Sequence, residues 1–205
     1  MAKYHITQTL ISAWNYMYSC RDECVDDARD AFINTLCRLP QEPTEAMTNG
    51  ILFEHEVYLE AAGAVREPHV KWESGIKAVA SHIQCAQTQV RLERDLLIGD
   101  KQFVVYGILD ALKAGTIYDV KFCNKSFHST ELAGKYLNSP QHPTYFYIVP
   151  EAYQFKYLVS DGKDLYTETY TRNNTTPFED IASEFVKYLE DTGLWVMFEQ
   201  KWRAY

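Results

Sequence analysis

The sequence predicts a mixed α/β (α+β) fold, with a central mixed sheet flanked by helices and a helical N-terminal part. Nearly half of the 205 residues are apolar (46%), which is enough to build a core. Apolar residues recur at helical spacing as far as about residue 86, and beyond it they alternate with polar residues, as in half-buried strands. Neither a linker nor an internal repeat interrupts the chain, so we expect a single domain over residues 1–205.

The expected elements follow this change of period in chain order. Residues 1–86 should be mainly helical, residues 88–150 should form an antiparallel meander followed by a helix, and residues 151–205 should form a hairpin and C-terminal helices. Thr7 or Thr9 is the expected cap of the first helix. Expected helices cover about 9–20, 23–36, 44–63, 70–86, 130–149, 177–191 and 194–202, and expected strands cover 88–98, 103–112, 116–123, 153–159 and 165–171.

Composition excludes several classes of protein. The formal net charge of −8 argues against a simple basic DNA-binding module, although bound cations and a local basic patch would still allow phosphate binding. The longest apolar runs fall short of the ~20 residues that a membrane span needs, and the N-terminus lacks the apolar stretch of a secretory signal. We therefore expect a cytoplasmic protein with no membrane partner. Five cysteines, an odd count, favour free thiols over disulfides.

The turn signal Ala114-Gly115 carries the main inference about chemistry. If these residues form a two-residue loop, Lys113 pairs with Thr116, and counting outward places Asp110 directly opposite Asp119. A four-residue loop gives the same register, whereas an odd-length loop or a bulge would shift it. Opposite residues share one face of a sheet with Cβ atoms roughly 4.5–5.5 Å apart, and Lys121, two residues further on, projects from that same face.

Two facing carboxylates repel each other, so they cost stability or take up a proton unless a cation lies between them. Oxygen ligands of this type suit Mg²⁺ or Mn²⁺ rather than zinc. Lys121 would then orient or deprotonate a water, or stabilise charge on a phosphoryl oxygen. The alternative is a solvated face on which Lys121 forms an ordinary salt bridge, but the apolar strand residues around these charges favour the metal site. Gly107 within its strand indicates close approach of a ligand or of another backbone.

These residues resemble a known family. Gly107-Ile-Leu-Asp110 followed by Asp119-Val-Lys121 is similar to the G-x-x-D … D-x-K core of PD-(D/E)XK nucleases, in their RecB-like, phage exonuclease-like branch. That branch also shows a histidine on an upstream helix and a Gln-x-x-x-Tyr element, for which this chain offers His55 and Gln141-His-Pro-Thr-Tyr145. The resemblance runs from near residue 7 to about residue 150 and implies a restriction-endonuclease-like core.

The resemblance also implies roles for individual residues. The metal ligands would be His55, Asp110, Asp119 and the backbone carbonyl of Val120, and Lys121 would act on the attacking water. Gln141 and Tyr145 would shape the site or contact DNA; Pro143 between them fits only the first turn of a helix. The glycine upstream of His55 lies five residues away, so Glu54 or Glu56 is an alternative ligand, and Glu93 is a weaker candidate.

The function implied is a deoxyribonuclease that uses one or two Mg²⁺ or Mn²⁺ ions. We expect an exonuclease that acts on linear DNA with free ends and leaves 5′-phosphates, in phage-type recombination or repair within a bacterial or phage-infected cell. An iron–sulfur cluster is not expected, because no cysteine follows Cys123. Expected partners are a single-strand-annealing or recombination protein, and a homo-oligomer is left open. The alternative is a non-catalytic DNA-binding or assembly partner that retains the nuclease fold.

Overall fold

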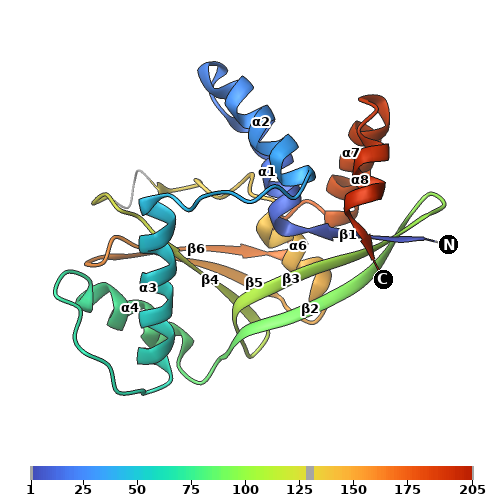
Figure 1. Cartoon of the computed structure of the whole chain (residues 1–205). Coiled ribbons are helices and arrows are strands. Elements are labelled where there is room, and N and C mark those ends of the chain that lie inside the picture. Colours follow the sequence, from blue (N-terminus) through green and yellow to red (C-terminus); the bar gives the residue numbers. More distant parts are fainter. Residues whose placement is uncertain (1, 128–131, 205) are drawn as a thin grey trace.

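The computed structural model describes residues 2–127 and 132–204, and it has the mixed α/β fold that the sequence predicts (Figure 1). A single sheet has the strand order β6-β5-β4-β3-β1-β7, and β2 pairs with β3 as well. The strands are β1 (Lys3–Thr7), β2 (Gln87–Ile98), β3 (Lys101–Lys113), β4 (Thr116–Phe122), β5 (Gln154–Ser160), β6 (Leu165–Thr171) and β7 (Arg203–Ala204). The sheet is mixed, because β1 with β3 and β4 with β5 are parallel and the other pairs are antiparallel.

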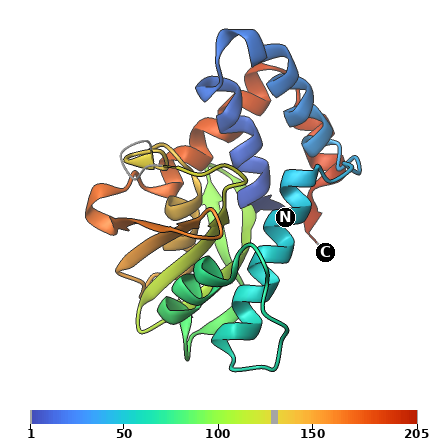
Figure 2. The ribbon, with the colours of Figure 1, turned by 90° about the vertical axis from the view of Figure 1, so that its left-hand side faces the viewer.

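Helices cover the sheet in two groups, which Figures 1 and 2 show from two directions. Phe53 of α3 and Val79 of α4 share one apolar cluster with Ala111 of β3 and Val120 of β4. Helices α1, α2, α6, α7 and α8 contribute to a second, larger cluster. The helices are α1 (Gln8–Ser19), α2 (Val25–Leu36), α3 (Glu45–Ala61), α4 (Glu73–Ile83), α6 (Gln141–Ile148), α7 (Phe178–Asp191) and α8 (Trp195–Lys201). None of the described helices combines the length and apolar character of a membrane span.

The structure departs from the sequence-based expectation at three places. Strands β1 and β7 were not predicted; β1 alternates polar and apolar residues, but over only five positions, and its partner β3 lies about 100 residues away. The helix expected over 70–86 begins only at Glu73. The helix expected over 130–149 is the shorter α6; the start of that prediction falls on residues 128–131, outside the described part, and residues 133–138 form turns.

Strand β3 is the organising element of the sheet. Its whole length pairs with β2 along one edge, from Lys101 to Leu112. Along the other edge it pairs first with β1, as far as Tyr106, and then with β4, from Ala111 onward. Residues 107–110 of β3 therefore pair with neither β1 nor β4, and the sheet forks there. Asp110 lies in this fork.

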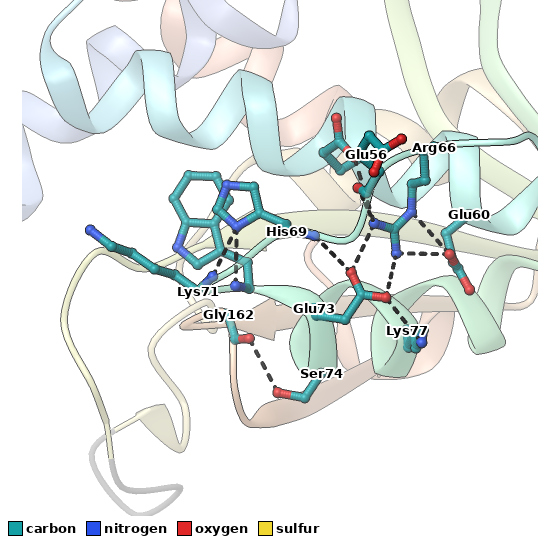
Figure 3. Close-up of polar contacts among 11 residues, drawn as sticks. Glu56, Glu60, Arg66, His69, Lys71, Glu73, Ser74, Lys77 and Gly162 are labelled. Atoms are coloured by element: carbon teal, nitrogen blue, oxygen red, sulfur yellow. Dashed lines mark hydrogen bonds and ion pairs between the residues drawn. The ribbon is translucent and has the colours of Figure 1, made fainter.

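The connection between α3 and α4 is held by a buried arginine (Figure 3). The side chain of Arg66 is only 6% exposed, and its guanidinium lies 2.8 Å from Glu60 and 2.9 Å from Glu73. Glu56 is more distant, at 3.7 Å. We call these four residues the Arg66 cluster. It fixes the loop between α3 and α4, the two helices that pack against Val120.

Candidate active site

The β3–β4 hairpin has the register that its turn predicts. Ala114 (φ 47°) and Gly115 (φ 74°) both have left-handed backbones, as a two-residue type I′ turn requires. Lys113 pairs with Thr116 and Ala111 pairs with Tyr118, so Asp110 and Asp119 are the next residues in the same register. Regular pairing ends at this point, because the Asp110 carboxylate (Oδ2) accepts a hydrogen bond from the backbone N–H of Val120 at 2.8 Å.

Asp119 is the most deeply buried acid of the site, at 1% exposure. One oxygen, Oδ1, accepts a hydrogen bond from the side-chain amide of Gln141. The other, Oδ2, lies 2.6 Å from Nζ of Lys121, yet it has no partner of proper hydrogen-bond geometry among the described residues. The ion pair is close but poorly directed. Asp119 therefore keeps a buried oxygen with unused capacity to bind a cation.

Burial and mutual repulsion govern the charges at the site. Burial raises the pKa of Asp110 well above its usual value, and the charges of Asp119 and Glu54 raise it further, against the opposing effect of Lys121. Burial likewise raises the pKa of Asp119, although Lys121 and Gln141 work against this. Burial by itself lowers the pKa of Lys121, but Asp119 and Asp110 more than offset it and the net shift is upward. Lys121 is thus protonated, and it faces two carboxylates whose negative charge is disfavoured by burial.

Tyr145 fills the fork in the sheet. Its hydroxyl donates a hydrogen bond of 2.8 Å to the carbonyl of Ile108, which lies in the stretch of β3 between its two partners. A Cβ added to Gly107 would lie 2.6 Å from Cε1 of Tyr145, so only glycine admits the ring. The close approach expected at Gly107 therefore exists, but a tyrosine side chain makes it rather than a ligand or another backbone.

Helix α6 brings the Gln-x-x-x-Tyr element to this fork. Gln141 and Tyr145 are one helical turn apart and share the face directed at β3 and β4. The helix begins at Gln141 with Pro140 as its N-cap, so Pro143 lies in the first turn, where a missing N–H costs no helical hydrogen bond. Pro143 therefore lies in the first turn of a helix, where the sequence analysis expected it.

Helix α3 decides between the three candidates for the third metal ligand. Phe53 and Val57 are fully buried against the sheet, and this fixes the rotation of the helix. Glu54 lies at the edge of that buried face, close enough for its charge to raise the pKa of Asp110. The side chain of His55 is exposed. Glu56 is turned to Arg66 (Figure 3). Of the three, Glu54 is the residue whose charge reaches Asp110, whereas His55 is exposed and Glu56 is directed at Arg66.

Glu93 does not belong to the site. It is exposed and pairs with Tyr106, in the half of β3 that adjoins β1. The residue of β2 opposite Asp110 is Gln89, four positions away, which corresponds to roughly 13 Å along a strand. Glu93 instead lies near His5 of β1, whose pKa it influences.

Two residues near the site escaped the sequence-based prediction. The side-chain amide of Gln89 donates to Glu54 at 3.0 Å and lies 2.8 Å from the hydroxyl of Tyr58, and that hydroxyl also donates to Glu54. A signal for both existed in the sequence. Tyr58 is one helical turn after Glu54, and counting back from the Gly99-Asp100 turn places Gln89 opposite Asp110.

The residues present fit a hard divalent cation, although the described residues contain no ready-made cluster of three His, Cys, Asp or Glu side chains. Asp110 and Asp119 supply carboxylate oxygens only, which is the chemistry that Mg²⁺ and Mn²⁺ prefer. Their raised pKa values and the unsatisfied Oδ2 of Asp119 are what a cation would relieve. The carbonyl of Val120 points to the same side of β4 as its N–H, which is the side of Asp110.

Comparisons with known proteins support the fold. LHK-Exo, in complex with dAMP, aligns with 96% of this chain and 92% of its own at a TM-score of 0.53 and 14% sequence identity. SSO0001 aligns with 91% of this chain and 77% of its own at a TM-score of 0.51 and 11% identity. No family model and no curated protein matches the sequence. At these identities the likeness concerns the fold alone, which is a mixed α/β (α+β) fold with a central mixed sheet flanked by helices.

Proposed function

We propose that this chain is a divalent-metal-dependent deoxyribonuclease of the PD-(D/E)XK type, in which Asp110 and Asp119 hold the metal and Lys121 acts at the reacting phosphate. The observation that carries the proposal is the Asp110–Asp119 pair in the fork of the sheet, with its raised pKa values and Lys121 beside it. A buried arrangement of like charges is costly to fold and is typical of functional sites. The likeness of the fold to that of LHK-Exo supports the same proposal.

The work at the site is divided among these side chains. Mg²⁺ or Mn²⁺, one or two ions, would supply positive charge to the scissile phosphate and make a water more acidic. Asp110, Asp119 and the carbonyl of Val120 are oxygen donors for that ion. Gln141 fixes the orientation of the Asp119 carboxylate by donating to Oδ1. Because its pKa is raised, Lys121 is protonated near neutral pH, which favours holding the attacking water and stabilising phosphoryl charge over deprotonating the water.

Glu54 takes the place that the sequence offered to His55. Its charge reaches both Asp110 and Lys121, whereas the imidazole of His55 is exposed. Tyr145 is the positioning residue of the fork, since its hydroxyl is already bound to the carbonyl of Ile108.

The substrate that we propose is linear DNA with free ends, cut by an exonuclease that leaves 5′-phosphates and serves phage-type recombination or repair. The name of LHK-Exo points to an exonuclease, and dAMP is the kind of nucleoside monophosphate that an exonuclease releases. The net charge of −8 supports local binding at a metal site rather than attraction over the whole surface. An annealing or recombination protein and a second copy of this chain remain proposed partners.

Degradation of linear DNA labelled at either the 5′ or the 3′ end tests this function, with Mg²⁺, Mn²⁺ or EDTA. We expect metal-dependent loss of one label first, and a decrease of roughly 10²–10³-fold in Lys121→Ala, since a single electrostatic group at a phosphoryl centre has this effect. Lys113→Ala is the matched control, because Lys113 lies at the far end of the hairpin, where it contacts the carbonyl of Gln84.

Full activity of Lys121→Ala would contradict the role given to this lysine. A folded wild-type protein that binds DNA in a mobility-shift assay and cleaves it with neither metal would instead favour the alternative of a non-catalytic binding partner.

A further inference from the structure

We propose that Gln89 is a positioning residue that holds Glu54 as the third acidic group of the site. The inference rests on the proposed nuclease function and deepens it. It concerns how a glutamate on α3, a helix that belongs to another layer, is kept directed at a metal site built on β3 and β4.

Gln89 occupies a special position in the backbone of β2. Its neighbours in the strand pair regularly, Thr88 with Ala111 and Val90 with Leu109, so Gln89 lies directly across from Asp110. Its φ is +53°, a left-handed conformation at the third residue of the strand. For a residue other than glycine this conformation is costly, and such strain persists only where the surroundings enforce it. Nothing in the length of β2 requires it, because the register is the same before and after Gln89.

The side chain of Gln89 makes two hydrogen bonds to residues of helix α3. Its amide nitrogen lies 3.0 Å from Oε1 of Glu54 and 2.8 Å from the hydroxyl of Tyr58. The hydroxyl of Tyr58 donates to the same oxygen of Glu54. The three side chains form a closed triangle in which Glu54 is the acceptor of two donors. Glu54 and Tyr58 come from successive turns of α3, so Gln89 is the only member that belongs to the sheet.

The triangle determines where the charge of Glu54 lies. Glutamate has three rotatable side-chain bonds and Glu54 is only partly buried, so without these donors its carboxylate would be free to turn toward solvent. Held by Gln89 and Tyr58 it stays near the fork, where it acts on both Asp110 and Lys121. One oxygen of Glu54 takes both hydrogen bonds, which leaves the other for the site.

Mn²⁺ titration calorimetry on the intact protein, with melting temperatures in the absence of metal, tests the proposal. Glycine adopts a left-handed backbone without strain, so Gln89→Gly should keep or raise the metal-free melting temperature while it removes the amide. We expect it to weaken Mn²⁺ binding about tenfold, the usual effect of losing a group that orients a metal ligand. Ala114→Gly, which relieves the same kind of strain in the hairpin turn, is the control and should leave Mn²⁺ binding unchanged.

A double-mutant cycle shows whether Gln89 acts through Glu54. Glu54→Gln should weaken Mn²⁺ binding, and Gln89→Gly should then cause little further loss in that background, because its target is gone. Gln89→Asn keeps an amide and a residue type that tolerates left-handed backbone, but its side chain is one methylene shorter, so it should behave like Gln89→Gly.

Three outcomes would overturn the proposal, and they can be told apart. A wild-type protein that binds no Mn²⁺ removes the proposed function itself. Wild-type affinity in both Gln89 variants with no fall in melting temperature, or the full tenfold loss on top of Glu54→Gln, shows that the metal site exists but does not depend on Gln89 through Glu54. A lower melting temperature of Gln89→Gly with unchanged Mn²⁺ affinity assigns Gln89 a structural role only.

Discussion

The Arg66 cluster and the fork each bring partly or fully buried charges together, and they obey opposite electrostatic rules. In the Arg66 cluster a buried guanidinium is surrounded by Glu60 and Glu73, whose side chains are 30% and 28% exposed. In the fork, the side chain of Asp119 is 2% exposed and the only nearby cation among the described residues is Lys121, which is 34% exposed. One cluster buries its cation and leaves its acids partly exposed; the other buries Asp119 and leaves its cation partly exposed.

The pKa values of the acids record the difference. Arg66, followed by Lys77, lowers the pKa of Glu73 to about 2. Burial, followed by Asp119 and Glu54, raises the pKa of Asp110 well above its usual value. A lowered carboxyl pKa means that folding favours the charge, and a raised one means that folding opposes it. The Arg66 cluster therefore stabilises the fold, whereas the buried charges of the fork lower its stability. Neither charge nor burial alone distinguishes a functional cluster from a structural one.

Removal of Arg66 is expected to have the largest effect on stability. Arg66→Ala leaves Glu60 and Glu73 facing each other, with Lys77 as the remaining cation at Glu73, and frees the loop between α3 and α4. The melting temperature should fall on the order of 5–10 °C, as is usual when one partner of a largely buried ion pair is removed. Thermal unfolding followed by circular dichroism measures it. A shift of less than about 2 °C would show that the cluster is not structural.

The opposite change is expected in the fork. Asp110→Asn keeps an acceptor for the N–H of Val120 but removes a charge that folding opposes. Without metal, its melting temperature near pH 7.5 should exceed that of the wild type on the order of 3 °C. Because the folded pKa of Asp110 is raised, its contribution to stability is present at low pH and is lost as the pH rises. The advantage of Asp110→Asn should therefore shrink toward pH 5.

The difference between the two proteins is the informative quantity. The pKa of buried His142 is lowered to about 4, so this residue makes the folded protein less stable as the pH falls below about 6.5. That loss is the same in the wild type and in Asp110→Asn. Added Mn²⁺ should raise the melting temperature of the wild type and not that of Asp110→Asn. A variant less stable than the wild type at pH 7.5 without metal would mean that the Asp110 charge is satisfied by the protein alone.

The smallest effect is expected at Glu56. This side chain is 18% exposed and 3.7 Å from Arg66, so it adds little to the cluster and is turned away from Asp110. Glu56→Gln should change the free energy of unfolding by less than about 0.5 kcal/mol and should leave Mn²⁺ binding unchanged. Weaker Mn²⁺ binding in this variant would return Glu56 to the set of ligands that the sequence had offered.

Much of the site was predictable because it depends on neighbours in the chain. The residues Ala114-Gly115 fix a two-residue turn, and the turn sets the register that places Asp110 across from Asp119. The spacing of Gln141 and Tyr145 places both on one face of a helix. Fold class and most elements followed from periodicity in the same way, whereas β1 and β7 did not, since each depends on a partner far away in sequence.

What the sequence by itself determined is the hairpin, its two carboxylates and the lysine beside them, because turn geometry and the two-residue period of a strand act over a few residues. The choice among Glu54, His55 and Glu56 was made only by the tertiary structure. Consecutive helical residues point about 100° apart, and the burial of Phe53 and Val57 against the sheet decides which of them faces the fork. The left-handed backbone of Gln89 belongs to the same category, since the hydrogen-bond partners of its side chain, Glu54 and Tyr58, lie on helix α3, far away in sequence.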